Sequence, residues 1–146
     1  MVCEEGQAKE AIMRLSRVGF DNCLGFLEGG FKTWQNSSNP IDTIDSKSAN
    51  EFEKSINNNI NILDVRQVGE RNNGYLKNSE HIPLALISSE NKSLNKSLKY
   101  YIHCAGGYRS MIACSILKKN GFDNTIDVDG GFGSILNNTS LEILQN

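Results

Sequence analysis

The sequence predicts an α/β fold in which a parallel sheet carries helices on both faces. Two observations lead to this prediction. Short runs rich in apolar, β-branched or aromatic residues recur at 60–65, 98–102 and about 125–128, and segments with helical spacing alternate with them. The chain has 146 residues, of which 38% are hydrophobic, so it can hold one complete domain with a core and at most a fragment of a second.

The first predicted helix of this domain is capped by Asp45 or Ser46 and has Ala49 and Phe52 among its apolar positions. A strand at 60–65 follows it. The later elements are, in order, an apolar run at 82–87, a helix around 90–97, a strand at 98–102, a helix ended by Gly121, a strand at about 125–128 and a closing helix opened by Gly130 and Gly131.

An internal repeat suggests how the chain is divided. The tetrapeptide Gly-Phe-Asp-Asn occurs at 19–22 and again at 121–124, and an acidic residue followed by Gly-Gly-Phe occurs at 28–31 and at 129–132. Two echoes at nearly the same offset indicate a duplicated unit of about 100 residues. The alternative is a short helical extension that resembles the second copy by accident.

Each copy also has a cysteine before its helical pattern, Cys3 in the first and Cys104 in the second. Only the second copy has room to be complete. The predicted organisation is the last third of a first unit at 1–36, a linker at 37–40, a complete domain at 41–138 and a C-terminal tail at 139–146.

Composition argues against several functions. With 15 basic and 17 acidic side chains and no basic stripe, nucleic acid is not an expected partner. No apolar run approaches the ~20 residues of a membrane span, and the start lacks a secretory pattern, so the expected compartment is the cytoplasm. The four cysteines form no Cys-x-x-Cys pair and there are two histidines, so we expect no metal and no cofactor.

The loop after the strand at 98–102 is the main candidate for chemistry. Cys104 stands at the carboxyl end of a parallel strand, where ligands bind in such sheets. Gly106 and Gly107 allow successive N–H groups to point inward, and the next helix adds the positive end of its dipole. Together with the positive charge of Arg109, these N–H groups and the helix dipole favour the thiolate form of Cys104.

Cysteine phosphatases use a similar cradle, but their loop has the pattern Cys-x5-Arg. Here Arg109 comes one position earlier and Ser110 takes the next place, so the smaller ring fits one extra sulfur atom on Cys104 better than a phosphate. A phosphatase therefore stays the weaker alternative.

The chain resembles the rhodanese family over about residues 41–137. The resemblance rests on four separated motifs, namely Leu63–Arg66, His81–Ala85, Tyr101–Ser110 and Asp129–Phe132. It implies a rhodanese-like three-layer fold and sulfurtransferase chemistry. In that chemistry Cys104 takes sulfur from a small sulfane-sulfur donor, carries it as a persulfide, and passes it to a thiol or to cyanide.

The resemblance also assigns roles around Cys104. Backbone N–H groups would hold the persulfide anion, and Arg109 would hold the loop or the negative end of the donor. Family members that use thiosulfate commonly have a basic residue after the cysteine, and Ala105 stands there in this chain. A persulfide or protein-bound donor is thus at least as well supported. The implied substrate-binding residues are Ala105, Gly106, Gly107, Tyr108, Arg109 and Ser110.

Three further residues are expected to support this loop. Asp64 and Arg66 end a strand, where an ion pair or a bracing role is favoured over contact with a ligand. His81 is expected to fix a turn by hydrogen bonding. His103 should point to the face of its strand opposite Cys104, which argues against a Cys–His pair.

The first copy has a different loop. Glu4 and Glu5 follow Cys3, and Ala8 stands where the second copy has Arg109, so Cys3 should be a poor nucleophile. This copy resembles the non-catalytic unit of tandem rhodaneses. The active loop is also similar to that of rhodanese units joined to a metallo-β-lactamase-fold domain, which is therefore a candidate partner. The alternative to an enzyme is a non-enzymatic binding or regulatory module of a larger sulfur-metabolism protein.

Overall fold

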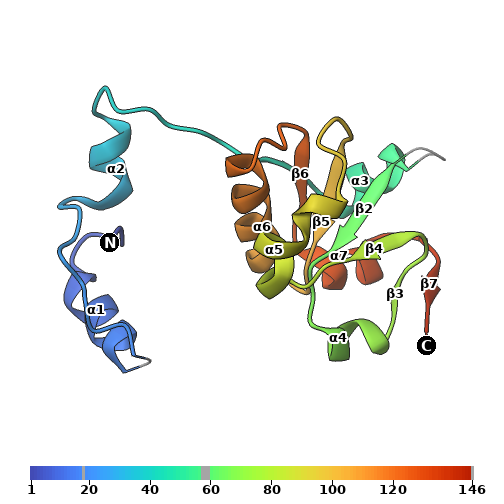
Figure 1. Ribbon diagram of the computed structural model, residues 1–146, viewed down its shortest axis with the longest axis horizontal. Coiled ribbons are helices and arrows are strands. Elements are labelled where there is room, and N and C mark those ends of the chain that lie inside the picture. Colours follow the sequence, from blue (N-terminus) through green and yellow to red (C-terminus); the bar gives the residue numbers. More distant parts are fainter. Residues whose placement is uncertain (18, 57–59, 146) are drawn as a thin grey trace. The chain divides into compact units, whose positions relative to one another are not determined.

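The computed structural model describes residues 1–17, 19–56 and 60–145 (Figure 1). It divides into two compact units, Met1–Thr43 and Ile44–Asn146. The division falls after Thr43, a few residues beyond the predicted linker at 37–40. None of the helices in the described ranges combines the length and the apolar character that a bilayer span requires.

The second unit is built on a five-stranded sheet in which every neighbouring pair is parallel. Its strands, in the spatial order of the sheet, are β1 (Asp45–Lys47), β6 (Thr125–Val128), β5 (Tyr100–His103), β2 (Asn61–Asp64) and β4 (Ser79–His81). Parallel neighbours need crossover connections, and helical segments supply these between the strands. The predicted parallel sheet is therefore confirmed.

Helices cover both faces of this sheet (Figure 1). The helices that pack on it are α5 (Ile87–Glu90) and α6 (Tyr108–Lys119) in one core and α3 (Ala49–Ser55) and α7 (Gly131–Asn138) in the other. The unit also contains the short helix α4 (Val68–Asn72) and the 3₁₀ turns η1 (Leu84–Leu86) and η2 (Asn91–Ser93). One core includes Leu63 and Ile102 with α5 and α6, and the other includes Ile62 and Tyr101 with α3 and α7. Adjacent strand residues thus enter opposite cores, which gives the expected three layers.

The first helix of this unit begins later than the sequence predicted. Asp45 and Ser46 lie in β1, and the cap of α3 is Ser48. The Ser48 hydroxyl accepts the N–H of Glu51, and the Glu51 carboxylate accepts the N–H of Ser48 at 2.9 Å. This reciprocal capping box fixes the helix start, so the prediction of Asp45 or Ser46 as the cap was wrong.

Two other segments differ from the sequence prediction. Helical structure expected around 90–97 lies earlier, in α5 and η2, because Ile87 is the fully buried anchor of that segment. The strand expected from residue 98 begins at Tyr100. The predicted tail at 139–146 contains β7 (Ile143–Leu144), which pairs antiparallel with β3 (Tyr75–Leu76).

The first unit contains α1 (Ala8–Ser16) and α2 (Gly30–Gln35). Gly30 is its one buried residue among those that the structure describes. Met1 forms a parallel pair with Phe26, since the Met1 amino group donates to Gly25 O and Leu27 N–H donates to Met1 O, both at 2.9 Å. This small set of contacts leaves the apolar side chains of the unit largely exposed.

The ends of α1 and α6 have the same hydrogen bonds. In each, a glycine with positive φ follows the helix, Gly19 at 90° and Gly121 at 85°. The N–H of the next phenylalanine then bonds to the carbonyl of a leucine in the last turn. The two bonds are Phe20 to Leu15 at 3.0 Å and Phe122 to Leu117 at 3.1 Å.

Candidate active site

Cys104 directly follows β5, and its side chain belongs to the core under α5 and α6. The residue is 1% exposed, so the sulfur lies at the bottom of the loop that leads into α6. His103 lies on the other side of the sheet and stacks on Phe132 with ring centroids 5.9 Å apart. Burial lowers the pKa of His103 to about 4, so its ring stays neutral near pH 7.

The loop directs hydrogen-bond donors at the sulfur. The N–H of Gly107 lies 3.1 Å from Cys104 Sγ, and the Ser110 hydroxyl lies 3.6 Å from it. Burial alone would raise the pKa of the thiol. The Ser110 hydroxyl and the backbone N–H groups of Ser110, Gly106 and Gly107 outweigh burial and hold this pKa below its ordinary value. The arrangement therefore favours a thiolate.

The start of α7 holds the cysteine loop in place through backbone hydrogen bonds. Cys104 O accepts the N–H of Phe132 at 2.6 Å, and Ala105 O accepts the N–H of Gly133 at 3.0 Å. Gly131 has a φ of +56°, and a Cβ there would meet Cys104 O and lie 2.9 Å from the carbonyl carbon of Ala105. Only glycine fits so close to the cysteine loop. Sequence reasoning used this Gly-Gly pair as a motif but missed its bracing role.

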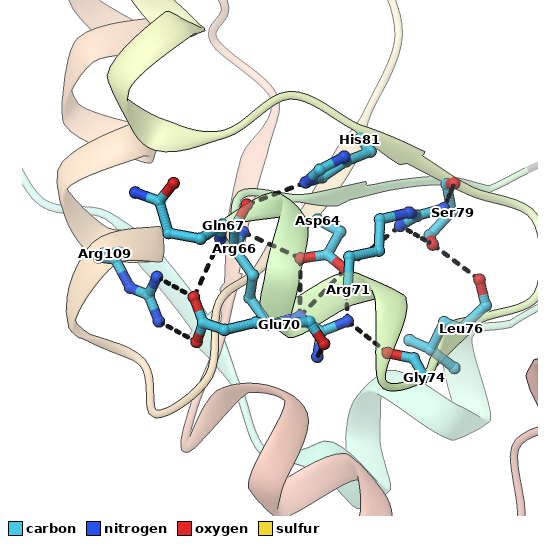
Figure 2. A network of polar contacts seen from close by, with 10 residues as sticks. All are labelled: Asp64, Arg66, Gln67, Glu70, Arg71, Gly74, Leu76, Ser79, His81 and Arg109. Atoms are coloured by element: carbon cyan, nitrogen blue, oxygen red, sulfur yellow. Dashed lines mark hydrogen bonds and ion pairs between the residues drawn. The ribbon is translucent and has the colours of Figure 1, made fainter. Parts of the chain in front are cut away.

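Arg109 forms an ion pair that sequence reasoning also missed. Its two terminal nitrogens donate to the two carboxylate oxygens of Glu70 at 2.6 and 2.7 Å (Figure 2). Hydrogen bonding to Arg109 lowers the pKa of Glu70 to about 2, so the pair stays ionised. The Gln-x-x-Glu spacing of Gln67 and Glu70 indicates a capping box at the start of α4, but no local signal indicates the pairing of Glu70 with Arg109, which lies 39 residues away.

The expected supporting residues form one network with α4 (Figure 2). Asp64, which is fully buried, accepts Arg66 Nη2 at 2.7 Å and Arg71 Nη1 at 3.2 Å. The Arg66 guanidinium stacks on the Phe132 ring at 3.8 Å. His81 Nε2 lies 2.9 Å from Arg66 O, so the histidine contacts the backbone of this turn. The network thus fixes the segment that carries Glu70.

A groove of about 450 Å³ lies beside the loop. Gly106 and Gly107 line it, together with Asp127 and Asp129. Tyr108 also lines it, and this residue is 84% exposed, so its ring does not cover Cys104. The predicted loop residues Gly106, Gly107 and Tyr108 therefore line one groove, and this groove is open beside Gly106 and Gly107.

The lowered pKa of Cys104 predicts the pH dependence of its reactivity. Alkylation by iodoacetamide should reach half its maximal rate below pH ~8.5, the ordinary thiol value, because the thiolate persists to lower pH. Ser110→Ala should raise this midpoint by about 0.5 pH units, because it removes the hydroxyl donor but keeps the backbone N–H of residue 110. Peptide mass spectrometry resolves Cys104 from Cys114, whose pKa burial raises to about 12. Identical midpoints in the folded and urea-unfolded chains would contradict this prediction.

The fold and the cysteine loop define a rhodanese-like domain. The chain belongs to this family, because the family model for the Rhodanese-like domain matches residues 44–138. The described fold agrees with that of a rhodanese-related protein from Thermoplasma volcanium (TM-score 0.64, 30% identity, 70% of this chain and 99% of that one). A rhodanese-like domain protein from Staphylococcus aureus gives a TM-score of 0.60 at 33% identity, over 68% of this chain and 97% of that one.

Two curated relatives come from Bacillus subtilis (strain 168). The protein named "Putative sulfur carrier protein YrkF" is 32% identical over 102 residues, which are 68% of this chain and 55% of that protein. The protein named "Putative sulfurtransferase YtwF" is 34% identical over 70 residues, which are 48% of this chain and 67% of that protein. The match to YrkF therefore spans little more than half of that relative.

Proposed function

We propose that this chain is a sulfurtransferase that carries sulfane sulfur as a persulfide on Cys104 and passes it to a thiol or to cyanide. One observation carries the proposal. The Cys104 sulfur lies among the N–H groups of Gly106, Gly107 and Ser110, which hold its pKa below the ordinary value. The names of the two B. subtilis relatives, a sulfur carrier and a sulfurtransferase, agree with this chemistry.

The first half of the reaction loads the cysteine. The Cys104 thiolate attacks the outer sulfur of a thiol persulfide, and a new S–S bond forms as the donor's S–S bond breaks. The electron pair of the broken bond leaves with the donor thiolate, and the transferred sulfur keeps its proton or releases it to solvent. The inward N–H groups that stabilise the thiolate would then stabilise the negative charge on the outer sulfur.

The second half returns the cysteine to its starting state. An acceptor thiolate or cyanide attacks the outer sulfur, the S–S bond to Cys104 breaks, and the Cys104 thiolate leaves with the electron pair. We propose that the acceptor approaches through the groove that Gly106 and Gly107 line. The same hydrogen bonds that favoured the thiolate before loading make it a good leaving group here.

Intact mass spectrometry tests this proposal. Wild-type protein incubated with glutathione persulfide should gain one sulfur atom, and cyanide should remove it as thiocyanate. Cys104→Ser should gain none. Cys3→Ser is the matched control and should gain sulfur as the wild type does, because its loop has Ala8 in place of an arginine. Absence of any adduct on wild-type Cys104 would favour the non-enzymatic binding or regulatory module instead.

We also propose that residues 1–36 correspond to the C-terminal part of a non-catalytic rhodanese unit. Three structural parallels support this proposal. The ends of α1 and α6 have matching bonds. The pair of Met1 and Phe26 corresponds to the pair of Ile102 and Asp127 in β5 and β6, and each residue of the first pair lies 101 positions before its counterpart in the second. A Cβ on Gly30 would meet Cys3 O, as one on Gly131 would meet Cys104 O.

We place the protein in a reducing cytoplasm. Its four cysteines are unpaired thiols, including the one on which the proposed chemistry depends. A disulfide at Cys104 would block sulfur transfer, and reducing conditions keep such thiols free.

A further inference from the structure

The Arg109–Glu70 ion pair lies at the rim of the loop. The two side chains are 30% and 36% exposed, so solvent and substrates can reach them. Glu70 is held by its own helix as well, because its Oε2 accepts the N–H of Gln67 at 3.0 Å. The carboxylate is thus fixed from two sides, and both terminal nitrogens of the guanidinium are engaged with it.

This arrangement weakens the attraction of the loop for anions. Arg109 is the basic side chain of the loop at 104–110, and Glu70 neutralises its charge at contact distance. Asp127 and Asp129 line the groove that Gly106 and Gly107 also border. The groove-lining residues in the described ranges include no basic side chain. Carboxylates thus pair with Arg109 and line the groove beside Gly106 and Gly107.

Two classes of sulfane-sulfur donor differ in where they carry charge. In thiosulfate, a sulfonate is bonded directly to the sulfur that is attacked, so its negative charge must enter the loop and approach Glu70. In a thiol persulfide, a carbon chain is bonded to the inner sulfur, and any carboxylates lie several bonds away. Repulsion between like charges falls with distance and with screening by solvent, so it penalises thiosulfate more.

We propose that Glu70 is a specificity-determining residue, which biases Cys104 towards thiol persulfides and against thiosulfate. This proposal rests on the sulfurtransferase function above. With thiosulfate, the Cys104 thiolate attacks the outer sulfur, the S–S bond breaks, and sulfite leaves with its electron pair. With a thiol persulfide, the same attack releases a thiolate. Glu70 acts on the first reaction because sulfite develops its negative charge next to the Arg109–Glu70 pair.

The test compares both donors on the full chain. Persulfide formation on Cys104 is followed by rapid quenching and intact mass, and a second-order rate constant is obtained for thiosulfate and for glutathione persulfide. In Glu70→Gln the ratio of the thiosulfate constant to the persulfide constant should rise about tenfold, because Arg109 regains an uncompensated charge. The glutamine oxygen can still accept the N–H of Gln67, so the start of α4 is kept.

Two controls separate charge from structure. Glu70→Asp keeps the carboxylate, so its ratio should stay within about twofold of the wild type. Glu142→Gln removes a carboxylate that pairs with Lys77 at 2.8 Å, next to the ends of β3 and β7, and its ratio should not change. An unchanged ratio in Glu70→Gln would overturn the proposal, whether both rate constants stay the same or both fall equally. Failure of wild-type protein to form any persulfide would instead overturn the sulfurtransferase function.

Discussion

Gly131→Ala is expected to disable the Cys104 loop and to destabilise the domain by about 3 kcal/mol. The new Cβ would meet Cys104 O and the carbonyl carbon of Ala105, which are backbone atoms that cannot move aside independently. The φ of +56° adds strain for any residue with a Cβ. Because the loop must shift, its N–H groups should lose their alignment with the sulfur, and persulfide formation should fall by a factor of about 100.

Gly133→Ala is the matched control for this change. It lies in the same helix, and its Cβ would meet Ala105 O at 3.5 Å, an ordinary contact. Its stability should equal or slightly exceed that of the wild type, because alanine favours a helix over glycine. Urea unfolding and alkylation of Cys104 would be measured on both variants. Equal behaviour of Gly131→Ala and Gly133→Ala would show that the contact with the loop does not matter.

Asp64→Asn is expected to cost about 3–5 kcal/mol of unfolding free energy, because it leaves the buried guanidinium of Arg66 without a counter-charge. Asp64 accepts bonds from Arg66 and Arg71, and all three residues lie in the network that fixes α4 (Figure 2). The Arg109–Glu70 pair should loosen with that segment. Urea denaturation gives the loss of stability, and the ratio of the two donor rate constants reports on the pair.

The pH dependence of stability provides a second measurement. Burial raises the pKa of Asp64, but hydrogen bonds and charge from Arg66 outweigh it, so the folded pKa lies below the unfolded value of about 3.9. The stabilisation by the carboxylate is then complete above that value and is lost as pH falls through the folded pKa. Asp64→Asn should lack this acid-induced loss. Glu142→Gln breaks an exposed ion pair and should lower the unfolding free energy by under about 1 kcal/mol. An equally small loss in Asp64→Asn would contradict the role of Asp64 as the counter-charge of the buried Arg66.

Local sequence was sufficient to predict three of the five strands, at 60–65, 98–102 and about 125–128, and the cysteine loop, whereas β1 and β4 were not predicted. The strand at 125–128 was predicted with its observed bounds, because Thr125, Ile126 and Val128 are β-branched residues, whose preference for strands is local. The loop from Cys104 was also readable, since glycines, a helix start and a preceding strand are adjacent in the chain. The first helix was misplaced because two polar residues before it resembled caps, while β1 depends on pairing with β6.

The tertiary structure decided how this loop is charged and braced. Arg109 and Glu70 are 39 residues apart in the chain, and Gly131 meets the loop from a different helix. β7 likewise exists through its pairing with β3. Sequence by itself determined most of the local elements and the candidate cysteine, because short-range backbone geometry specifies them. The pairing of Arg109 with Glu70, that of Asp64 with Arg71, and the bonds to Cys104 O became visible only in the folded chain, because ion pairs and close backbone contacts depend on how the packing brings segments together.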